Sequence, residues 1–306
     1  MPESEATDRP EHPIRNLTLN DTSRGVFLCS KIEPHPWNQT REDWERLIDI
    51  QPDGCFGIDV DGELVATATT TVYGDNQLAW IGMVITKKEH QSQGMGTQLL
   101  DKCIQYCSDI EVHTVKLDAT PQGKDRVYVT RGFKDEYQIA RRIRPAGEAD
   151  RVSDLTRVIR DDQIDSIIEF DAPYFGANRG NLLRRLIESN ELRGLVIEEK
   201  GHIKGYALAR EGRKYTYLGP CVVEDQDLGH ALLGNLLCLL PHDKPVFLDV
   251  MHDNAHANSV ATALGFEEPI RVLDRMYLDL NTPGGKENPY PGQPIHIIGG
   301  SGFETG

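Results

Sequence analysis

Alternating apolar and polar positions in the first half of the chain predict a hairpin followed by a buried strand. Residues 55–74 form two β-rich, partly alternating runs on either side of Asp61 and Gly62, a pair typical of tight hairpin turns. Residues 78–85, LAWIGMVI, are apolar almost throughout and predict a central strand. Between residues 94 and 107 apolar side chains recur at helical intervals, so one face of a helix can lie on the sheet.

Three further elements are predicted in the first half. Residues 113–119, HTVKLDA, predict the next strand, and residues 137–145, YQIARRIRP, predict a closing strand. Between them, residues 125–133 predict a short helix that ends at Gly132, because glycine readily adopts the left-handed conformation that terminates helices. The fold class expected from these elements is α/β, with a mixed sheet flanked by helices.

The second half repeats this order of elements. It contains a hairpin-like pair of runs at 192–211, an apolar run at 214–223, an apolar helix around 228–240, and strands at 245–251 and 273–280. The repeated order indicates two similar α/β units in tandem.

Equivalent dipeptides support a duplication. Leu117-Asp118 precedes Leu248-Asp249 by 131 residues, and Gly132-Phe133 precedes Gly265-Phe266 by 133 residues. Duplication of one unit explains this agreement more simply than two unrelated domains, although convergence on common βαβ patterns can account for part of it.

The expected organisation is a first unit at residues 1–146, a second at 147–281 and a tail at 282–306. The stretch between the units is polar and contains Pro145 and Gly147, as linkers often do. The tail is rich in Gly and Pro, which prevent long regular elements. It is either flexible or pinned by its apolar residues across a cleft between the domains.

Composition restricts the class of partner. The 306 residues are 39% hydrophobic, enough for a substantial core. There are 48 acidic and 33 basic residues, giving a formal net charge of -15. This charge argues against binding nucleic acid, which uses clustered Lys and Arg. It favours a cationic or neutral substrate, or it reflects a solvated surface suited to a salty cytoplasm.

No metal or membrane signal stands out. The six cysteines lack metal-site spacing, so reduced, buried thiols are expected. His252 and His256 stand four apart but have no evident third ligand, and Asp253 or Asn254 suits a helix N-cap there. With no leader and no apolar span of membrane length, we predict a cytoplasmic monomer or homodimer without membrane or nucleic-acid partners.

A glycine-rich segment, HQSQGMGTQL at residues 90–99, connects the predicted central strand to the predicted helix. Unpaired backbone N–H groups at such a helix start converge on one point and bind anions. A side chain at Gly94 or Gly96 would keep a bulky pyrophosphate away from these amides. The dinucleotide fingerprint needs a third glycine and the Walker loop needs Gly-Lys-Ser/Thr, and the segment has neither.

Two motifs carry a resemblance to a known family. Residues 91–96 match the pattern Gln/Arg-x-x-Gly-x-Gly/Ala, and residues 128–133 match Tyr-x-x-x-Gly-Phe. With the order of elements from residue 55 to 144, they resemble the acetyl-CoA-binding unit of the GNAT superfamily of N-acetyltransferases. IRNLTLND near the start and WNQT at 37–40 are also similar to members. The resemblance implies acetyl-CoA as cosubstrate and no metal.

The resemblance also implies which residues hold the coenzyme. The strand before the loop would splay from its neighbour and bond the pantetheine arm through main-chain groups, with Gly82 allowing a bulge. The loop would take the pyrophosphate, assisted by Lys87, Lys88 or Lys124. The implied coenzyme-binding residues are Met83, Val84, Ile85, Gln91, Ser92, Gln93, Gly94, Met95, Gly96 and Thr97.

Acetyl transfer from a thioester requires a deprotonated amine, a polarised carbonyl and a proton for the departing thiolate. The resemblance implies that a backbone N–H near Val84 polarises the carbonyl. It also implies that Tyr128 protonates the sulfur, the alternative being a ring that only packs. Residues 78–85 contain no titratable side chain, so Asp118 on the next strand is the candidate base. Asp118 can instead cap a turn or hold an arginine.

The second unit departs from the family pattern. Residues 219–232 contain no equivalent of the glycine loop, and Ala261 occupies the position of the tyrosine. FGANR at 175–179, YLGP at 217–220 and LDVMHDN at 248–254 resemble the C-terminal domain of a tandem acetyltransferase subfamily. We expect this unit to have kept the fold, lost the coenzyme and taken a role in shaping the amine pocket.

Four residues are candidate substrate contacts: Trp37, Asn38, Tyr217 and Asp249. Asp249 ends an apolar strand, where the topology directs a side chain into the cleft. It either binds an ammonium group or is a structural carboxylate that accepts backbone hydrogen bonds. Aromatic residues on such elements are often simply packed, which is the alternative for Trp37 and Tyr217.

The predicted function is direct transfer of acetyl from acetyl-CoA to a primary amine in the first unit. The acidity favours polyamines or aminoglycoside-like bases, although an amino acid or a protein N-terminus fits the sequence too. One alternative is a non-catalytic acyl-CoA-binding sensor, favoured by the missing base on the central strand and the degenerate second half. Another is a nucleotide-phosphate enzyme that uses the same loop.

Overall fold

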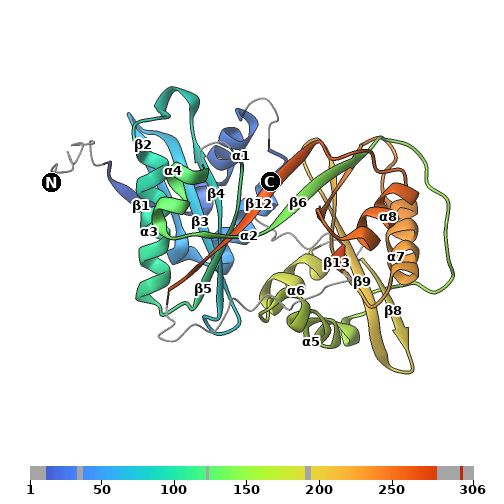
Figure 1. The fold of residues 1–306 in the computed structure, drawn as a ribbon. Coiled ribbons are helices and arrows are strands. Elements are labelled where there is room, and N and C mark those ends of the chain that lie inside the picture. The colour runs from blue at the N-terminus through green and yellow to red at the C-terminus, as the bar shows by residue number, and fades with distance from the viewer. Residues whose placement is uncertain (1–11, 33–36, 122–123, 190–193, 281–296, 299–306) are drawn as a thin grey trace.

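The computed structural model describes residues 12–32, 37–121, 124–189, 194–280 and 297–298 (Figure 1). In the first half, the strands are β1 (Ile14–Asn16), β2 (Cys55–Val60), β3 (Glu63–Tyr73), β4 (Leu78–Thr86), β5 (Thr114–Ala119) and β6 (Lys134–Arg144). The helices are α1 (Thr22–Ser30), α2 (Arg41–Ile50), α3 (Met95–Asp109) and the short α4 (Lys124–Val127).

In the second half, the strands are β7 (Arg157–Val158), β8 (Leu195–Glu199), β9 (His202–Glu211), β10 (Thr216–Val223), β11 (Val246–Met251), β12 (Arg271–Asp279) and β13 (Ile297–Ile298). The helices are α5 (Ile164–Phe175), α6 (Gly180–Glu188), α7 (Gln226–Leu239) and α8 (Ala255–Ala263). The mixed α/β fold and the repeated order of elements are confirmed. Within the described ranges, no helix is both long and apolar enough to cross a bilayer.

The predicted turns form for the expected steric reason. Asp61 and Gly62 have φ of 50° and 80°, so both central residues of the β2–β3 hairpin are left-handed, as a tight turn between twisted strands requires. Lys200 and Gly201 repeat this turn between β8 and β9 with φ of 53° and 81°. Gly132, with φ of 87°, follows the short helical segment as predicted.

One mixed sheet runs through both halves in the order β1-β2-β3-β4-β5-β12-β6-β11-β13-β10-β9-β8-β7. Strand β12, from the second half, pairs with β5 on one side and β6 on the other. Strand β6, from the first half, pairs in turn with β11. Each half therefore contributes one long strand, β6 or β12, to the part of the sheet formed by the other half, at the centre of Figure 1. The expected boundary at residues 146–147 divides the sequence but not the sheet.

Two buried ion pairs join the exchanged strands, β12 and β6, to the neighbouring strands β5 and β11 of the other half. Asp118 on β5 lies opposite Arg275 on β12, which donates from Nε and Nη2 to the two carboxylate oxygens over 2.8 and 3.0 Å. Asp249 on β11 lies opposite Arg141 on β6, with both bonds at 2.7 Å. The repeated Leu-Asp dipeptides of the sequence thus occupy equivalent positions, each aspartate holding an arginine from the other half.

Aromatic rings complete both bridges. The Arg275 guanidinium lies 4.3 Å from the ring centroid of Trp80, and that of Arg141 lies 4.5 Å from that of Phe247. The Asp118 side chain is 1% exposed, and burial raises the pKa of this carboxyl above its ordinary value. Burial alone would lower the pKa of Arg275, but attraction to Asp118 raises it. Each charge therefore depends on its partner.

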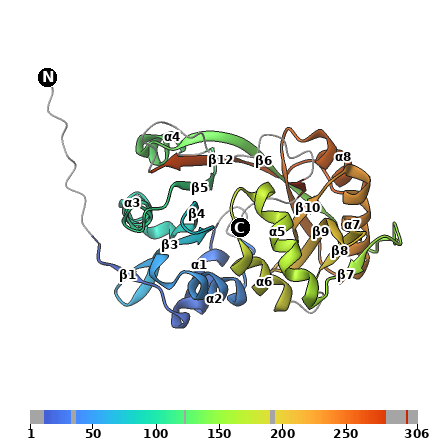
Figure 2. The same ribbon diagram turned by 90° about the horizontal axis from the view of Figure 1, so that it is seen from below.

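Helices cover both faces of the sheet. In the first unit α3 packs on one face, while α1 and α2 pack on the opposite one (Figure 2). In the second unit α7 packs on strands β8–β10, and α5 and α6 also contact β9. Helix α2 contacts α6, and one core cluster includes Trp44 and Tyr73 of the first unit and Ile168 and Tyr206 of the second. Helices α1, α2, α5 and α6 therefore form a layer that joins the two units, in addition to the exchanged strands.

Asn38 fixes a turn of the second unit against the first. Its Nδ2 donates to the carbonyl of Tyr215 over 3.0 Å, and its Oδ1 accepts from the backbone N–H groups of Lys214 and Tyr215 over 3.0 and 3.1 Å. A Cβ at Gly212 would lie 1.9 Å from Asn38 Nδ2, so only glycine fits the approach. Asp43 on α2 adds an ion pair of 3.2 Å to Arg210 on β9.

We expect Asp118→Asn to lower the free energy of unfolding by about 3–5 kcal/mol, because it leaves Arg275 buried without its counter-charge. Urea denaturation followed by circular dichroism measures the change. Asp162→Asn is the matched control, since Asp162 pairs with Arg160 at the surface and such pairs contribute about 1 kcal/mol or less. Equal shifts in the two variants would show that the buried bridge does not hold the exchanged strand.

Candidate active site

Strands β4 and β5 begin as a parallel pair and then separate. They pair only at Leu78–Thr114, Ala79–Val115 and Trp80–Lys116, although β4 continues to Thr86 and β5 to Ala119. On its other side β4 stays paired with β3, and β5 with β12. Within the described ranges, the edge of β4 that faces β5 therefore has no strand partner over its second half. Such an edge can bond an extended ligand through main-chain groups.

A β-bulge interrupts the pairing of β4 with β3 in this second half of the strand. Thr69 pairs with Gly82, whereas Thr67 pairs with Ile85, so β4 contains one residue more than β3 in this interval. Met83 takes the left-handed conformation with φ of 48°, and its carbonyl accepts a 2.8 Å hydrogen bond from Thr67 Oγ1. The predicted bulge is present, but the left-handed residue is Met83 and not Gly82. A non-glycine residue in this conformation is strained and is held by its surroundings.

The glycine loop ends in an uncapped helix. Ser92 and Gly94 have φ of 65° and 92°, and α3 begins at Met95 without a capping side chain or an acidic residue in its first turn. The backbone N–H groups of residues 94–97 are those for which a helix offers no internal partner. The loop folds back on itself, because Gln91 Nε2 donates to the Thr86 carbonyl over 3.1 Å. The arrangement presents free amides to an anion.

Close packing requires a small residue in the first turn of α3. A Cβ at Gly96 would lie 3.2 Å from Thr86 Oγ1, tighter than an ordinary contact. Two of the nearby lysines are already paired: Lys87 with Glu63 at 2.9 Å, and Lys124 with Asp135 at 2.8 Å and Asp274 at 3.1 Å. The attraction for an anion here comes mainly from the backbone amides.

Tyr128 lies on the same side of the sheet as α3. It precedes the turn at residues 129–131 and packs edge-on against Phe133, with the ring centroids 6.1 Å apart. Burial raises the pKa of this phenol above its ordinary value. Within the described chain its hydroxyl has no hydrogen-bond partner. The hydroxyl is therefore protonated at neutral pH and available as a donor.

Asp118 lies just beyond the last β4–β5 pair. Both of its oxygens accept from Arg275, which also donates to Tyr137 Oη over 2.6 Å. The sequence left three roles open for Asp118: a base, a turn cap or the partner of an arginine. The geometry favours the last of these. The predicted base, Asp118, is thus already held in an ion pair. The predicted acid, Tyr128, has no hydrogen-bond partner for its hydroxyl in the described chain.

The sequence interpretation missed a row of polar groups on the face opposite α3. Thr67, Thr69 and Thr71 alternate along β3, and Trp80 lies opposite Thr71 on β4. Thr69, Thr71 and Trp80 are at most 1% exposed. In the described part of the chain, the Thr69 and Thr71 hydroxyls and the Trp80 indole N–H have no hydrogen-bond partner. The every-second-residue threonines in ATATTT were the available sequence signal.

The four candidate substrate residues do not gather at one point. Trp37 is half-buried against the core of the α1–α2 layer, and Asn38 binds the β9–β10 turn. Tyr217 is buried, with its ring 4.7 Å from Phe247 between centroids and the Arg210 guanidinium 4.7 Å from its own centroid. Asp249 is buried and paired with Arg141. The contacts of Asn38 and Asp249 favour structural roles.

The second unit has the same opening between strands, but it is filled. Strands β10 and β11 pair in parallel at Thr216–Val246 and Tyr217–Phe247, as β4 and β5 do at their start. Beyond these pairs β13 runs between them, with Ile297 and Ile298 paired to β10 and Ile298 paired to Val250 on β11. The tail was predicted to be either flexible or pinned, and this part of it is a strand. It lies within the second unit's sheet.

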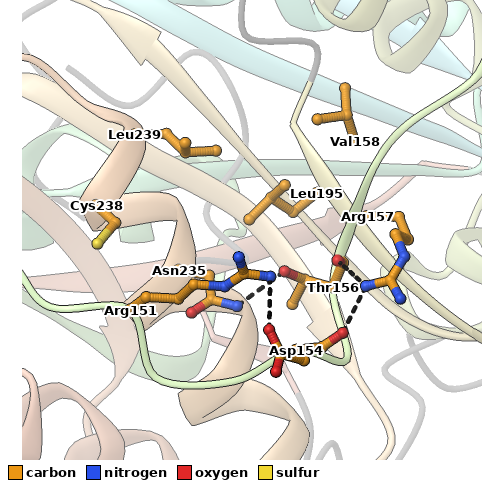
Figure 3. Close-up of a pocket in the computed structure, with 9 residues that line it drawn as sticks. All are labelled: Arg151, Asp154, Thr156, Arg157, Val158, Leu195, Asn235, Cys238 and Leu239. Carbon is orange, nitrogen blue, oxygen red and sulfur yellow. Dashed lines mark hydrogen bonds and ion pairs between the residues drawn. The ribbon is translucent and has the colours of Figure 1, made fainter.

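Two other cavities lie outside this site. One of about 640 Å³ lies in the second unit (Figure 3), and its lining residues are Arg151, Asp154, Thr156, Arg157, Val158, Leu195, Asn235, Cys238 and Leu239. Another, of about 550 Å³, lies where residues 73–76 of the first unit meet residues 178–181 of the second. Tyr73–Asn76 lies at the end of β3 and start of β4, away from the glycine loop that follows β4.

No group of three metal-ligating side chains is found in the described ranges. His256 Nδ1 lies 2.8 Å from Gln226 Oε1, and His252 Nδ1 lies 2.9 Å from Asp253 Oδ1. Asn254 caps α8 by accepting from the backbone N–H of Ala257 over 2.9 Å, one of the two predicted caps. The six cysteines are free thiols, and all except Cys238 are buried.

Comparisons with known proteins match both halves to one family. Residues 25–133 match the Acetyltransferase (GNAT) family, and residues 167–290 match the Acetyltransferase (GNAT) domain. The chain is similar to the uncharacterized N-acetyltransferase YitH of Bacillus subtilis, with 23% identity over 224 residues, 72% of this chain and 76% of that protein.

Solved structures share the fold over almost the whole chain. A putative acetyltransferase from Pyrococcus horikoshii superposes with a TM-score of 0.77 and 21% identity, covering 99% of each chain. The N-myristoyltransferase of Saccharomyces cerevisiae with bound myristoyl-CoA superposes with a TM-score of 0.70 and 12% identity, covering 98% of this chain and 93% of that one. The common architecture therefore includes the sheet that runs through both halves.

We expect Gly96→Val to weaken binding of coenzyme A by about 10- to 100-fold, because the side chain would fill the space before the α3 amides and remove hydrogen bonds to a charged group. Isothermal titration calorimetry measures the dissociation constant. Gln105→Val, an equally β-branched replacement at an exposed position of α3, is the control and should bind normally. Unchanged affinity in Gly96→Val would exclude this helix start as the pyrophosphate site.

Proposed function

We propose that this chain, a member of the GNAT superfamily with two GNAT domains in tandem, transfers an acetyl group from acetyl-CoA to a primary amine in its first unit. Acetyltransferase function follows from the family, and members use acyl-CoA as cosubstrate. The observation that carries the proposal is the open edge of β4 leading into the uncapped start of α3. No such combination occurs at β10 and β11 in the described chain.

The residues fit a coenzyme with an extended arm and an anionic end. The main chain of Met83, Val84 and Ile85 lies on the open edge and would bond the pantetheine arm, while residues 91–97 would hold the pyrophosphate. The bulge at Met83 turns the backbone at the point where the arm would reach the reacting carbonyl. When bound, the coenzyme supplies a thioester carbonyl.

In the proposed reaction the amine nitrogen forms a bond to the acetyl carbonyl carbon, and the carbon–sulfur bond breaks. The backbone N–H of Val84 would stabilise the oxyanion of the tetrahedral intermediate. Tyr128 would donate its phenolic proton to the departing sulfur and regain a proton from solvent before the next turnover. Burial moves the pKa of this phenol further above its ordinary value, so the hydroxyl carries at neutral pH the proton that this step needs.

A protein base is not required by this scheme. Asp118 was the predicted base, but accepting a proton there would break a bond to Arg275 inside a buried pair. We assign Asp118 the structural role of holding β12. In this scheme the amine loses its proton to solvent. The amine then reacts from its neutral form, so the rate should rise with pH until the amine is deprotonated.

The second unit is proposed to shape the acceptor site and not to bind coenzyme. Its β10–β11 opening is occupied by β13, and no glycine loop follows β10. It contributes β12, whose Arg275 lies against Trp80 of the first unit. The cytoplasmic location and the monomeric or homodimeric state expected from the sequence stay predictions.

The main rival is a non-catalytic acyl-CoA sensor, which would bind the thioester without transferring it. The filled β10–β11 opening is compatible with both a transferase and a sensor. The Tyr128 hydroxyl has no hydrogen-bond partner in the described chain and can act as an acid, which favours the transferase.

We expect Tyr128→Phe to lower kcat by roughly 100-fold or more with acetyl-CoA and an accepted amine, since general acid catalysis contributes on that order. The KM for acetyl-CoA should change little, because the ring remains. Thiol release measures both constants. Tyr106→Phe is the control: it removes another hydroxyl of the first unit, one that accepts from Gln51 and lies on α3.

A wild-type rate in Tyr128→Phe would remove this residue from the mechanism. Absence of thiol release from the wild type with a broad amine panel, together with normal acetyl-CoA binding, would favour the sensor.

We expect one acetyl-CoA to bind per chain, because β13 occupies the second opening. Calorimetric titration of the full chain measures this stoichiometry, and Gly96→Val tells the two units apart. Under the proposal the variant loses the single binding event. Two equivalents in the wild type, or one full-affinity equivalent left in Gly96→Val, would show that the second unit binds coenzyme.

A further inference from the structure

The face of the sheet opposite α3 contains many charges, and its carboxylates are already neutralised. Asp118 holds Arg275, Asp249 holds Arg141, and Glu136 holds Lys116 at 2.8 Å. In the α1–α2–α5–α6 layer, Asp43 holds Arg210 and Arg46, and Asp171 holds Arg179 at 2.7 Å. Each of these acids is at most 6% exposed at its side chain. None of them offers an uncommitted negative charge to an incoming amine.

Arg271 is the exception among the cations of this face in the described chain. It lies on β12 directly opposite Arg141 on β6, and it points to the same face as Arg275, four residues further along the strand. Its guanidinium is half-buried, and within the described ranges it has no ion pair or hydrogen bond. Burial lowers its pKa, and the neighbouring charge of Arg141 lowers it further.

The register places Arg271 beside the coenzyme opening. Strand β5 ends at Ala119, which pairs with Asp274, so Arg271 lies beyond the end of β5. The electrostatics link it to the bridges, since Arg271 interacts with both Arg141 and Asp249, and Asp118 interacts with the same two residues. Arg271 therefore belongs to the cluster that borders the β4–β5 separation on the face away from α3.

Trp80, Thr69 and Thr71 add hydrogen-bond donors and hydroxyls to this face. The indole N–H of Trp80 can only donate, and the hydroxyls of Thr69 and Thr71 can do so. A half-buried guanidinium that has no directly paired carboxylate in the described chain is stabilised by an anion that joins it. The acceptor face is thus complementary to a negative group and not to a second positive one.

We propose that Arg271 binds an anionic group, a carboxylate or a phosphate, carried by the acceptor amine. This inference rests on the proposed acetyltransferase function and narrows its substrate class from amines in general to amines with an acidic group. A planar guanidinium can hold either anion through two parallel hydrogen bonds. Polyamines, which the net charge of the chain favoured, would bring a second cation towards Arg271 and Arg141.

Pairs of acceptors that differ by one anionic group test the proposal. L-Lysine is compared with cadaverine, 4-aminobutyrate with propylamine, and phosphoethanolamine with ethanolamine, with thiol release from acetyl-CoA as the readout. We expect kcat/KM to be higher for the anionic member of at least one pair. The lysine and aminobutyrate pairs report a carboxylate preference, and the third pair reports a phosphate preference.

Arg271→Gln should then lower kcat/KM for the preferred anionic acceptor by about 10- to 100-fold, the loss expected for hydrogen bonds to a charged group. The effect should fall on the KM of the acceptor and leave the KM of acetyl-CoA unchanged. Arg271→Lys should recover part of it, because the positive charge returns without the planar fork. Arg157→Gln is the control, since Arg157 on β7 contacts only backbone carbonyls in the second unit.

A binding measurement separates this inference from the proposed function. Each anionic acceptor is added to the coenzyme A-loaded chain, and the resulting rise in Tm is compared between the wild type and Arg271→Gln. Binding that needs Arg271, without turnover of any amine, would support the anion site and count against the transferase. Equal kcat/KM within every pair, or an equal loss for both members in Arg271→Gln, would overturn the assignment of Arg271, as would acid binding that the variant retains.

Discussion

The exchange of β6 and β12 between the two halves depends on two buried bridges, Asp118–Arg275 and Asp249–Arg141. In each bridge an aspartate on a host strand faces an arginine on a strand supplied by the other half, and an aromatic ring lies against the guanidinium. Since an unpaired buried charge is far more costly than a paired one, neither strand can leave its host without a large penalty. The bridges tie the units into one sheet and fix the side chains between them.

The two halves have the same arrangement of strands but differ at the gap between their parallel strands. Both contain a parallel strand pair that separates after two or three residue pairs. In the first half the gap leads into the glycine loop and the uncapped start of α3, and its β4 edge is open. In the second half β13 pairs on both sides of the gap. The same backbone geometry thus suits an extended coenzyme arm in one unit and a strand of the chain itself in the other.

Charge pairing on the face opposite α3 links the scaffold to the proposed chemistry. The carboxylates there neutralise arginines that hold strands in place, so they are unavailable as bases or as partners for ammonium groups. In the described chain, Arg271, Trp80, Thr69 and Thr71 on this face have no hydrogen-bond partner for their side-chain donors or hydroxyls. The negative charge of the whole chain and the character of this face therefore point to different substrates. Local groups at short range in a low dielectric outweigh a distant, screened surface charge.

The sequence by itself determined the order of elements, the left-handed turns at Gly62 and Gly132, the duplication and the glycine loop, because these follow from hydrophobic period and backbone sterics within a few residues. It did not reveal the α1–α2–α5–α6 layer, whose packing joins distant segments. Only the tertiary structure decided that β12 lies between β5 and β6, that Asp118 and Asp249 are held by arginines, and that Arg271 has no such partner among the described residues. Strand order and ion pairing are contacts between residues more than a hundred positions apart, and no local pattern specifies them.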